Sequence, residues 1–283
     1  MNFPHLNDFN KKMHLDKELK PFAKFVQLLG KKITIFGTHM GRMTMLFQQI
    51  CKWTFRKPFE VKNIYHQMVE IGVYSLSVTS LTSLFTGMVL ALQTGMASKN
   101  ILNEPLYVGT AVGFSMVKEL GPVLTSIVIA GRVGAAIAAE LGTMNVTEQI
   151  DALHTLGTNP VKYLAVPRFL ACLLMVPILV LYADLIGVLG GYIVSIYKLG
   201  VPSSVYYHDI IDYMTMGDIF HGLIKSVFFA FIIIMVSCYK GFSAQGGAEG
   251  VGKATTQTVV ISMVLILVSD YFITALLQVI GIG

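Results

Sequence analysis

The sequence is poor in charge, since Asp, Glu, Lys and Arg make up only 13% of its 283 residues. Soluble globular proteins carry about 25% charged residues, so this shortage excludes an ordinary soluble enzyme. Disorder is excluded as well, because 54% of the residues are hydrophobic and 11% are aromatic, far more apolar surface than disordered chains have. The composition therefore predicts an integral membrane protein.

Cysteines and catalytic motifs are also scarce. The three cysteines, Cys51, Cys172 and Cys238, lack CxxC spacing, so neither a metal site nor a disulfide framework is predicted. The motifs HExxH and GxSxG are absent, which argues against an enzyme. Residues 247–253, GAEGVGK, match the start of a P-loop, but Ala254 stands where Ser or Thr is needed. We therefore predict no cofactor bound by this chain, and a glycine-rich cytoplasmic loop at 247–253.

Positive charge is concentrated in the first quarter of the chain. Residues 1–70 hold twelve Lys and Arg against five Asp and Glu, and residues 71–283 hold nine against eleven. A basic patch can bind nucleic acid, but before an apolar span it is more typical of a cytoplasmic flank facing anionic lipid. Apolar residues recur every three or four positions over 22–50, which indicates an amphipathic interfacial helix. Residues 1–62 are therefore predicted to form a basic, amphipathic interfacial segment with no nucleic-acid partner.

Five apolar stretches are long enough to cross a bilayer as helices, which takes about 20 residues. They are 71–92, 107–139, 169–197, 217–239 and 255–282. Gly121-Pro122 is predicted to kink or break the second. Five spans put the termini on opposite sides, and the Lys and Arg bias then predicts a cytoplasmic N-terminus and an extracytoplasmic C-terminus. The predicted fold is an all-α integral membrane protein, with an interfacial elbow helix before a five-span domain at 63–283.

Six of the charged residues within these stretches are predicted to lie inside the membrane: Lys118, Glu119, Arg132, Asp184, Lys225 and Asp270. An ionisable residue in a membrane is costly and usually faces the protein interior with a partner. Counting about 1.5 Å per residue along each helix, we predict that Lys225 pairs with Asp270 or Asp184. Lys118 or Glu119 is predicted to line the same outer cavity, with Arg132 nearer the cytoplasm. Two roles stay open for these charges: fixing helix register, or contacting a headgroup.

A short cytoplasmic helix of about three turns is predicted near 146–156, between the second and third spans. Val146, Ile150 and Leu153 fall on one face, while polar residues fall on the other, so one side can dock and the other can make polar contacts. Gly157 is suited to the turn that ends this helix.

Five segments together resemble the MlaE-type permeases of MCE lipid-transport ABC systems. They are SLFTGMVLALQ (83–93), KELGPVLT (118–125), AGRVGAAIAAELGTM (130–144), EQIDAL (148–153) and LGTNP (156–160) followed by PR at 167–168. The resemblance implies two copies of this chain in a bacterial inner membrane, with separate cytoplasmic ATPase subunits that bind ATP and Mg. It also implies phospholipid as substrate and an extracytoplasmic MCE-domain lipid-binding protein. The coupling helix to the ATPase would include Glu148, Gln149, Asp151, Ala152 and Leu153.

A lipid path is predicted on the first span. Leu84, Met88, Leu92 and Gly95 form an uncharged helical stripe that ends beside Gln93, which suits acyl chains below a polar headgroup. Packing against another helix explains this stripe equally well.

The resemblance implies a phospholipid permease subunit powered by a separate ATPase. Two alternatives remain, a secondary transporter or channel, and a membrane scaffold that moves nothing. The inverted repeat found in many secondary transporters is not visible in this sequence.

Overall fold

The computed structural model describes residues 21–56, 60–102 and 107–281. The chain divides into two compact units, with the boundary between Leu46 and Phe47. The division predicted between residues 62 and 63 separates an interfacial segment from a membrane-spanning domain, and it stays a prediction. Residues 1–20 of the predicted interfacial segment lie outside the described residues.

The first described helix is α2, Pro21–Thr54, where the apolar periodicity predicted one. Its residues up to Leu46 belong to the first unit and its last two turns to the second. There, the ring of Phe47 packs 5.1 Å from Phe231 and 6.4 Å from Phe169, measured between centroids. The helix is confirmed, and its position at a membrane surface stays a prediction.

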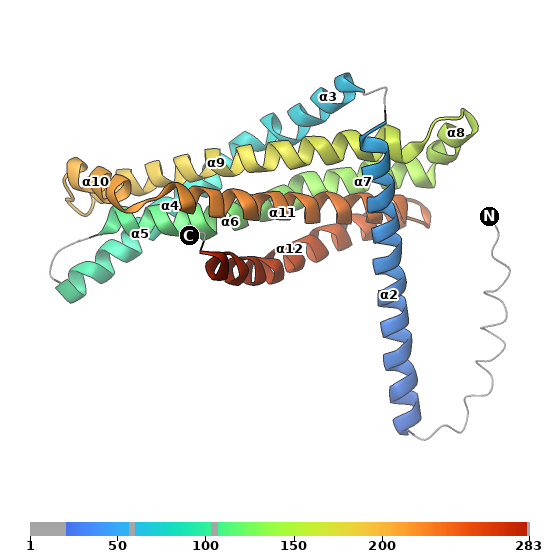
Figure 1. Cartoon of the computed structure of the whole chain (residues 1–283), viewed down its shortest axis with the longest axis horizontal. Coiled ribbons are helices and arrows are strands. Elements are labelled where there is room, and N and C mark those ends of the chain that lie inside the picture. The colour runs from blue at the N-terminus through green and yellow to red at the C-terminus, as the bar shows by residue number, and fades with distance from the viewer. Residues whose placement is uncertain (1–20, 57–59, 103–106, 282–283) are drawn as a thin grey trace. The chain divides into compact units, whose positions relative to one another are not determined.

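The second unit is a bundle of helices in which α8 and α10 lie at opposite ends (Figure 1). Its helices are α3 (Val61–Ile71), α4 (Leu76–Leu102), α5 (Val108–Ser115), α6 (Gly121–Ile129), α7 (Ala135–Val146), α8 (Gln149–Thr155), α9 (Val166–Tyr197), α10 (Ser203–Tyr213), α11 (Met216–Phe242) and α12 (Gly247–Ile280). The described residues contain no β-strand. The all-α prediction is confirmed.

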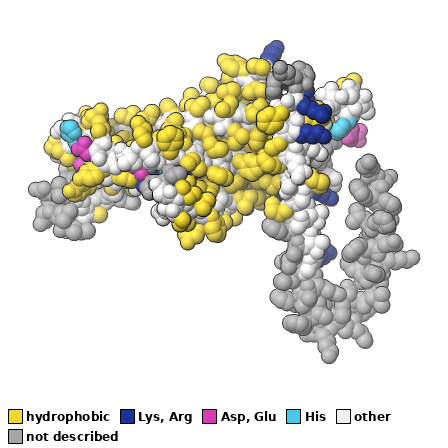
Figure 2. All heavy atoms as spheres, viewed as in Figure 1, with side chains coloured by type: hydrophobic (Ala, Val, Ile, Leu, Met, Phe, Trp, Pro, Cys, Tyr) yellow, Lys and Arg dark blue, Asp and Glu magenta, His cyan; other side chains and the backbone are white. Residues whose placement is uncertain are grey.

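Among the described residues, five helical stretches are long and apolar enough to cross a membrane. They are Val61–Asn100, Val108–Val146, Val161–Tyr197, Met216–Phe242 and Gly247–Ile280. Hydrophobic side chains cover much of the visible surface of the bundle (Figure 2), as lipid contact requires. The prediction of a five-span membrane protein is therefore confirmed.

The second span stays helical through Gly121-Pro122, so the predicted break does not occur. A π-helical turn, Met116–Leu120, directly precedes α6, and another, Ala130–Gly134, separates α6 from α7. Proline removes one helical donor, and a wider π turn is one way for a helix to accommodate such a defect. The proline therefore alters the winding of the span without ending it.

The fifth span begins eight residues earlier than predicted, at Gly247, so the prediction of a loop at 247–253 is wrong. Gly246 and Gly247 have φ angles of 91° and 70°, which glycine adopts readily. They make the sharp turn that lets α12 start at once. A helix does not have the geometry of a phosphate-cradling P-loop.

Glycines let α4 and α9 approach closely. A Cβ added to Gly87 on α4 would lie 1.8 Å from the carbonyl oxygen of Gly187 on α9, and one added to Gly190 would lie 2.3 Å from that of Leu84. In lipid, contacts of this kind hold helices together because apolar burial contributes little. The bundle thus depends on backbone contact at this crossing.

Replacing Gly87 with Ala is expected to destabilise the folded chain by about 1–3 kcal/mol, the usual cost of overpacking. The measurement is thermal unfolding in detergent. Gly252→Ala on α12 is the matched control, because nothing lies within 4 Å of a Cβ at that position. Equal unfolding midpoints for the two variants would contradict the proposed close contact.

Candidate functional site

A buried lysine organises a polar cluster inside the bundle, in the half nearer α10. Lys225 on α11 is 0% exposed. Its Nζ donates to Glu119 Oε2 at 2.6 Å and to the carbonyl oxygen of Lys118 at 3.1 Å, and lies 2.9 Å from Asp270 Oδ1. The predicted pair of Lys225 and Asp270 is confirmed, and Glu119 is a second carboxylate partner. A buried charge of this kind requires such partners.

The carbonyl that Lys225 binds is freed by Pro122. In an α-helix the N–H of residue 122 would bind the carbonyl of Lys118, four residues earlier, and proline has no N–H. Lys225 supplies the missing donor from a neighbouring helix. The π turn and the buried lysine therefore form one structural unit, which links the second, fourth and fifth spans.

A second ion pair lies beside the first. Lys118 Nζ lies 2.8 Å from Asp218 Oδ1 and 4.8 Å from the ring centroid of Phe114. Asp218 also forms a capping box at the start of α11, where its Oδ2 accepts from the backbone N and the side-chain Oγ1 of Thr215. Asp218 was not among the residues predicted from the sequence, although Thr-x-x-Asp before an apolar run is a signal of this cap.

The cluster holds more carboxylates than ammonium groups. Lys118 and Lys225 face Glu119, Asp218 and Asp270. The side chain of Glu119 is 42% exposed, and its Oε1 accepts from Thr274 Oγ1 at 3.3 Å. Glu119 is therefore the most exposed member of the cluster, although it contacts the buried lysine directly. That Lys118 or Glu119 lines an outer cavity stays a prediction.

The other predicted partner, Asp184 on α9, does not pair with Lys225. Asp184 is 6% exposed and lies against Gly121, where an added Cβ would fall 1.7 Å from its Oδ1. That oxygen accepts no hydrogen bond from the described residues. Helix α9 packs against α4, α11, α3 and α6, but Asp184 faces Gly121, whereas Lys225 faces the π turn and α12. Asp184 and Lys225 therefore lie at a similar depth but on different sides of the second span.

The predicted lipid stripe lies partly in helix packing. The backbone of Leu84 contacts Gly190, and Gly95 is buried against Leu199. Met88 and Leu92 are half-buried. A cavity of about 330 Å³ lies on a different face of α4, between Phe85, Thr86, Val89, Leu90, Gln93 and Leu120. Gln93 is the one member of the predicted set that lines it, and the lipid role of the set stays a prediction.

Arg132 lies in the π turn Ala130–Gly134, in the half of the bundle nearer α8. Its Nη1 donates to Ser75 Oγ at 2.7 Å and to the carbonyl oxygen of Glu70 at 3.3 Å. About 20 Å of helix separates it from Lys118 at 1.5 Å per residue. The relative depth predicted for these two residues agrees with this placement.

The predicted coupling segment contains α8, which has two turns instead of three. Residues up to Val146 belong to α7, and Glu148, with φ of 60°, turns the chain into α8. Ile150 is buried and Leu153 half-buried, as the apolar face predicted. The other residues of the predicted coupling set are exposed, namely the polar Glu148, Gln149 and Asp151 and the small Ala152. Gly157, with φ of 73°, follows the end of the helix.

Helix α8 is fixed to the bundle on both sides. Before it, Asn145 Nδ2 donates to the carbonyl oxygen of Ala244 in the turn between α11 and α12 at 2.9 Å. After it, Asn159 Oδ1 accepts from the backbone N of Val161 and of Lys162, at the start of the third span. Helix α8 is therefore joined by short segments to the second and third spans and, through Asn145, lies next to the turn between the fourth and fifth.

Comparison with known proteins agrees with this architecture. The chain matches the family model of the MlaE permease over residues 64–276. It is 45% identical over 252 residues to a probable ABC transporter permease protein of Rickettsia typhi, covering 88% of this chain and 96% of the relative. It is 40% identical over 222 residues to another of Synechocystis, covering 76% and 82%.

A further relative is the intermembrane phospholipid transport system permease protein MlaE of Haemophilus influenzae, which is 35% identical over 258 residues. That alignment covers 90% of this chain and 98% of the relative. The family match includes the Lys225 cluster and α8. The chain therefore belongs to the MlaE family of permeases.

Proposed function

We propose that this chain is the membrane-spanning subunit of an ABC transporter that moves phospholipid between the inner membrane and an extracytoplasmic MCE protein. In this proposal two copies of the chain assemble with separate cytoplasmic ATPase subunits, which bind ATP and Mg. The observation that carries the proposal is α8, a short helix with exposed acidic residues that is fixed to the end of a five-span permease domain. Phospholipid as substrate is supported by the name of the Haemophilus relative.

Helix α8 is suited to transmit motion from an ATPase into the membrane. It follows α7 after the turn at Glu148, and α7 leads through the π-helical turn Ala130–Gly134 and α6 to the π-helical turn that contains Lys118 and Glu119. Helices bend readily at such turns. Movement of α8 on ATP binding would therefore shift the second span against the fourth and fifth and change which side of the membrane the lipid path faces.

The polar cluster is suited to the headgroup and α4 to the acyl chains. Glu119 offers an exposed carboxylate that Lys225 and Thr274 hold in place. The cavity along α4 has an apolar wall with Gln93 at one end. A lipid needs this combination of apolar surface and a few polar groups.

Purification of the chain with its natural partners tests the proposal. We expect an ATPase and an extracytoplasmic lipid-binding protein in the complex, and phospholipid identified by mass spectrometry. ATP hydrolysis by the complex should rise when phospholipid is added. A complex that lacks an ATPase would contradict the proposal and favour a secondary transporter or channel. A rate of ATP hydrolysis that does not change when phospholipid is added would favour a scaffold.

Membrane orientation is testable at α8 and α10. A cysteine replacing the exposed Asp212 in α10 is expected to react with a membrane-impermeant maleimide added to spheroplasts. A cysteine replacing His154 in α8 should react only after the membrane is opened. Cys172 and Cys238 are buried and Cys51 is replaced by Ser, so background labelling stays low. Labelling of position 154 from outside would contradict the proposed orientation.

A further inference from the structure

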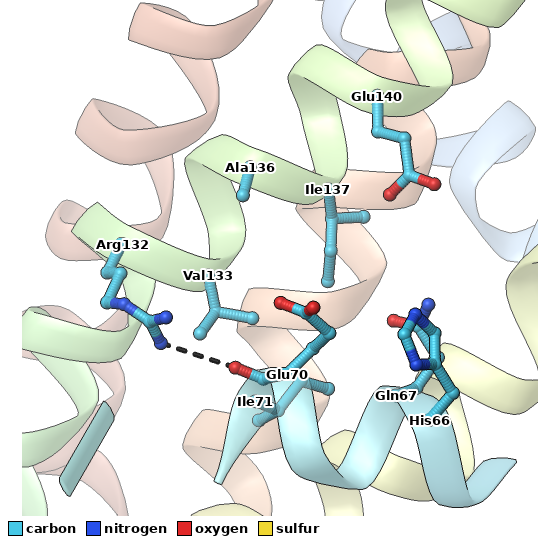
Figure 3. A pocket seen from close by; sticks show the side chains of 9 residues that line it. All are labelled: His66, Gln67, Glu70, Ile71, Arg132, Val133, Ala136, Ile137 and Glu140. Carbon is cyan, nitrogen blue, oxygen red and sulfur yellow. Dashed lines mark hydrogen bonds between the residues drawn. The ribbon is translucent and has the colours of Figure 1, made fainter. Parts of the chain in front are cut away.

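A cavity of about 300 Å³ lies between α3 and the second span, far from the Lys225 cluster (Figure 3). Its polar lining consists of His66, Gln67 and Glu70 from α3, Arg132 from a π turn, and Glu140 from α7. Apolar side chains, including Val133 and Ile137, complete the wall. The cavity therefore combines charges of both signs with apolar surface.

The opposite charges in this cavity do not neutralise each other. Arg132 Nη1 donates to two neutral oxygens, those of the Glu70 backbone and the Ser75 hydroxyl. Glu140 is held by Arg168, whose Nη2 lies 2.6 Å from Glu140 Oε1. Within the described part of the chain, the Glu70 carboxylate makes no ion pair, and it points into the space between the helices (Figure 3). A guanidinium and a carboxylate are thus both presented to a ligand.

The cavity lies near the headgroup level of the bundle. Trp53, Arg56, Glu60, Ile64 and Lys162 line a second pocket at a similar height along α3, where Arg56 and Lys162 lie 5.3 and 5.6 Å from the Trp53 ring centroid. Mixed aromatic and basic residues are typical of the membrane interface. Ile64 is only two residues from His66 along α3, so the cavity lies within one or two turns of this interface.

We propose that this cavity binds the headgroup of a zwitterionic, amine-bearing phospholipid from the leaflet at the α8 end. Glu70 accepts from the ammonium group, Arg132 donates to the phosphate, and the apolar wall contacts the start of the acyl chains. Charge-assisted hydrogen bonds of this kind are stronger than those between neutral groups. The inference deepens the proposed function, on which it rests for phospholipid as ligand, by naming a headgroup class.

The test is native mass spectrometry of the purified chain in detergent, titrated with phosphatidylethanolamine and with phosphatidylglycerol. The wild type should retain the first lipid preferentially. Glu70→Gln should reduce that preference about tenfold, the scale of one charge-assisted hydrogen bond, with an unchanged unfolding midpoint because Glu70 is exposed. Glu249→Gln is the control, since that carboxylate is exposed at the start of α12. An equal preference in wild type and Glu70→Gln would overturn the proposal.

Two more measurements test the role of Arg132 and the membrane origin of the ligand. Arg132→Lys should weaken the retention of both lipids, because both carry phosphate, and unchanged retention would overturn the role of Arg132. Excess water-soluble glycerophosphoethanolamine should not displace the lipid, and displacement would overturn the assignment to a membrane lipid.

A chain that keeps the headgroup preference but transports no lipid would contradict the proposed function alone. A chain that transports lipid but whose headgroup preference is unchanged by Glu70→Gln would overturn the proposed site and leave the proposed function standing.

Discussion

Replacement of Lys225 by Met is expected to destabilise the folded permease by about 3–5 kcal/mol, the usual cost of removing one partner from a buried ion pair. The substitution keeps an unbranched side chain, one atom shorter, but leaves Glu119 and Asp270 without their shared cation. It also leaves the carbonyl oxygen of Lys118 without a donor. The measurement is unfolding of the purified chain in detergent, alongside its yield in membranes.

Neutralising the stranded carboxylates should restore part of this loss. Lys225→Met combined with Asp270→Asn and Glu119→Gln is expected to unfold at a higher temperature than Lys225→Met alone, because the coupling between contacting charges is removed. Lys253→Met is the control, since Lys253 pairs with Glu249 at an exposed surface, where such pairs contribute little. A triple variant no more stable than Lys225→Met would show that the cluster is not held together by these charges.

Reversing the charge of α8 should uncouple the transporter without unfolding it. Asp151→Lys, alone and with Glu148→Lys, is expected to lower ATP-dependent lipid transfer at least about tenfold, the equivalent of about 1.4 kcal/mol of coupling. Both side chains are exposed, and surface substitutions usually change stability by less than about 0.5 kcal/mol. The measurements are lipid transfer by the reconstituted complex and co-purification of the ATPase.

A charge reversal elsewhere at the same end separates coupling from net charge. Glu249→Lys on the first turn of α12 changes the charge by the same amount as Asp151→Lys, and it should leave transfer unchanged. Normal transfer and normal ATPase binding in the Asp151 and Glu148 variants would remove α8 as the coupling element.

Periodicity and composition were sufficient for the five spans and for several contacts. Long apolar stretches have one stable conformation in lipid, the helix, so their existence followed from the sequence. Depth counting placed Lys225 and Asp270 at one level, and the 2.9 Å contact confirms that pair. The apolar face of α8 was also predicted, and Ile150 is buried there.

The sequence did not show towards which neighbouring helix each side chain points around its helix axis. Asp184 has a suitable depth but faces Gly121, because the contact of Gly87 with Gly187 determines how α9 is turned. The same contact places the cavity of α4 beside Phe85 and Val89, one residue away from the predicted stripe. Helix rotation is decided by packing between segments that are distant in sequence.

The remaining differences come from a proline and from two glycines. Pro122 predicted a kink or a break, yet Lys225 binds the carbonyl that the proline frees and the span continues. The glycine-rich run 247–253 predicted a loop, and this prediction is wrong because Gly246 and Gly247, with positive φ angles, make a short turn that starts α12. At Pro122 a contact with a distant helix compensates the defect, and at the two glycines the backbone conformation does.

The proposal that a separate ATPase drives lipid movement through this chain is tested most directly by transfer of labelled phospholipid from proteoliposomes to an MCE acceptor protein. Transfer is measured with the permease alone and with its ATPase. We expect transfer only when the permease, the ATPase and hydrolysable ATP are all present. Equal transfer by the permease without the ATPase would contradict it.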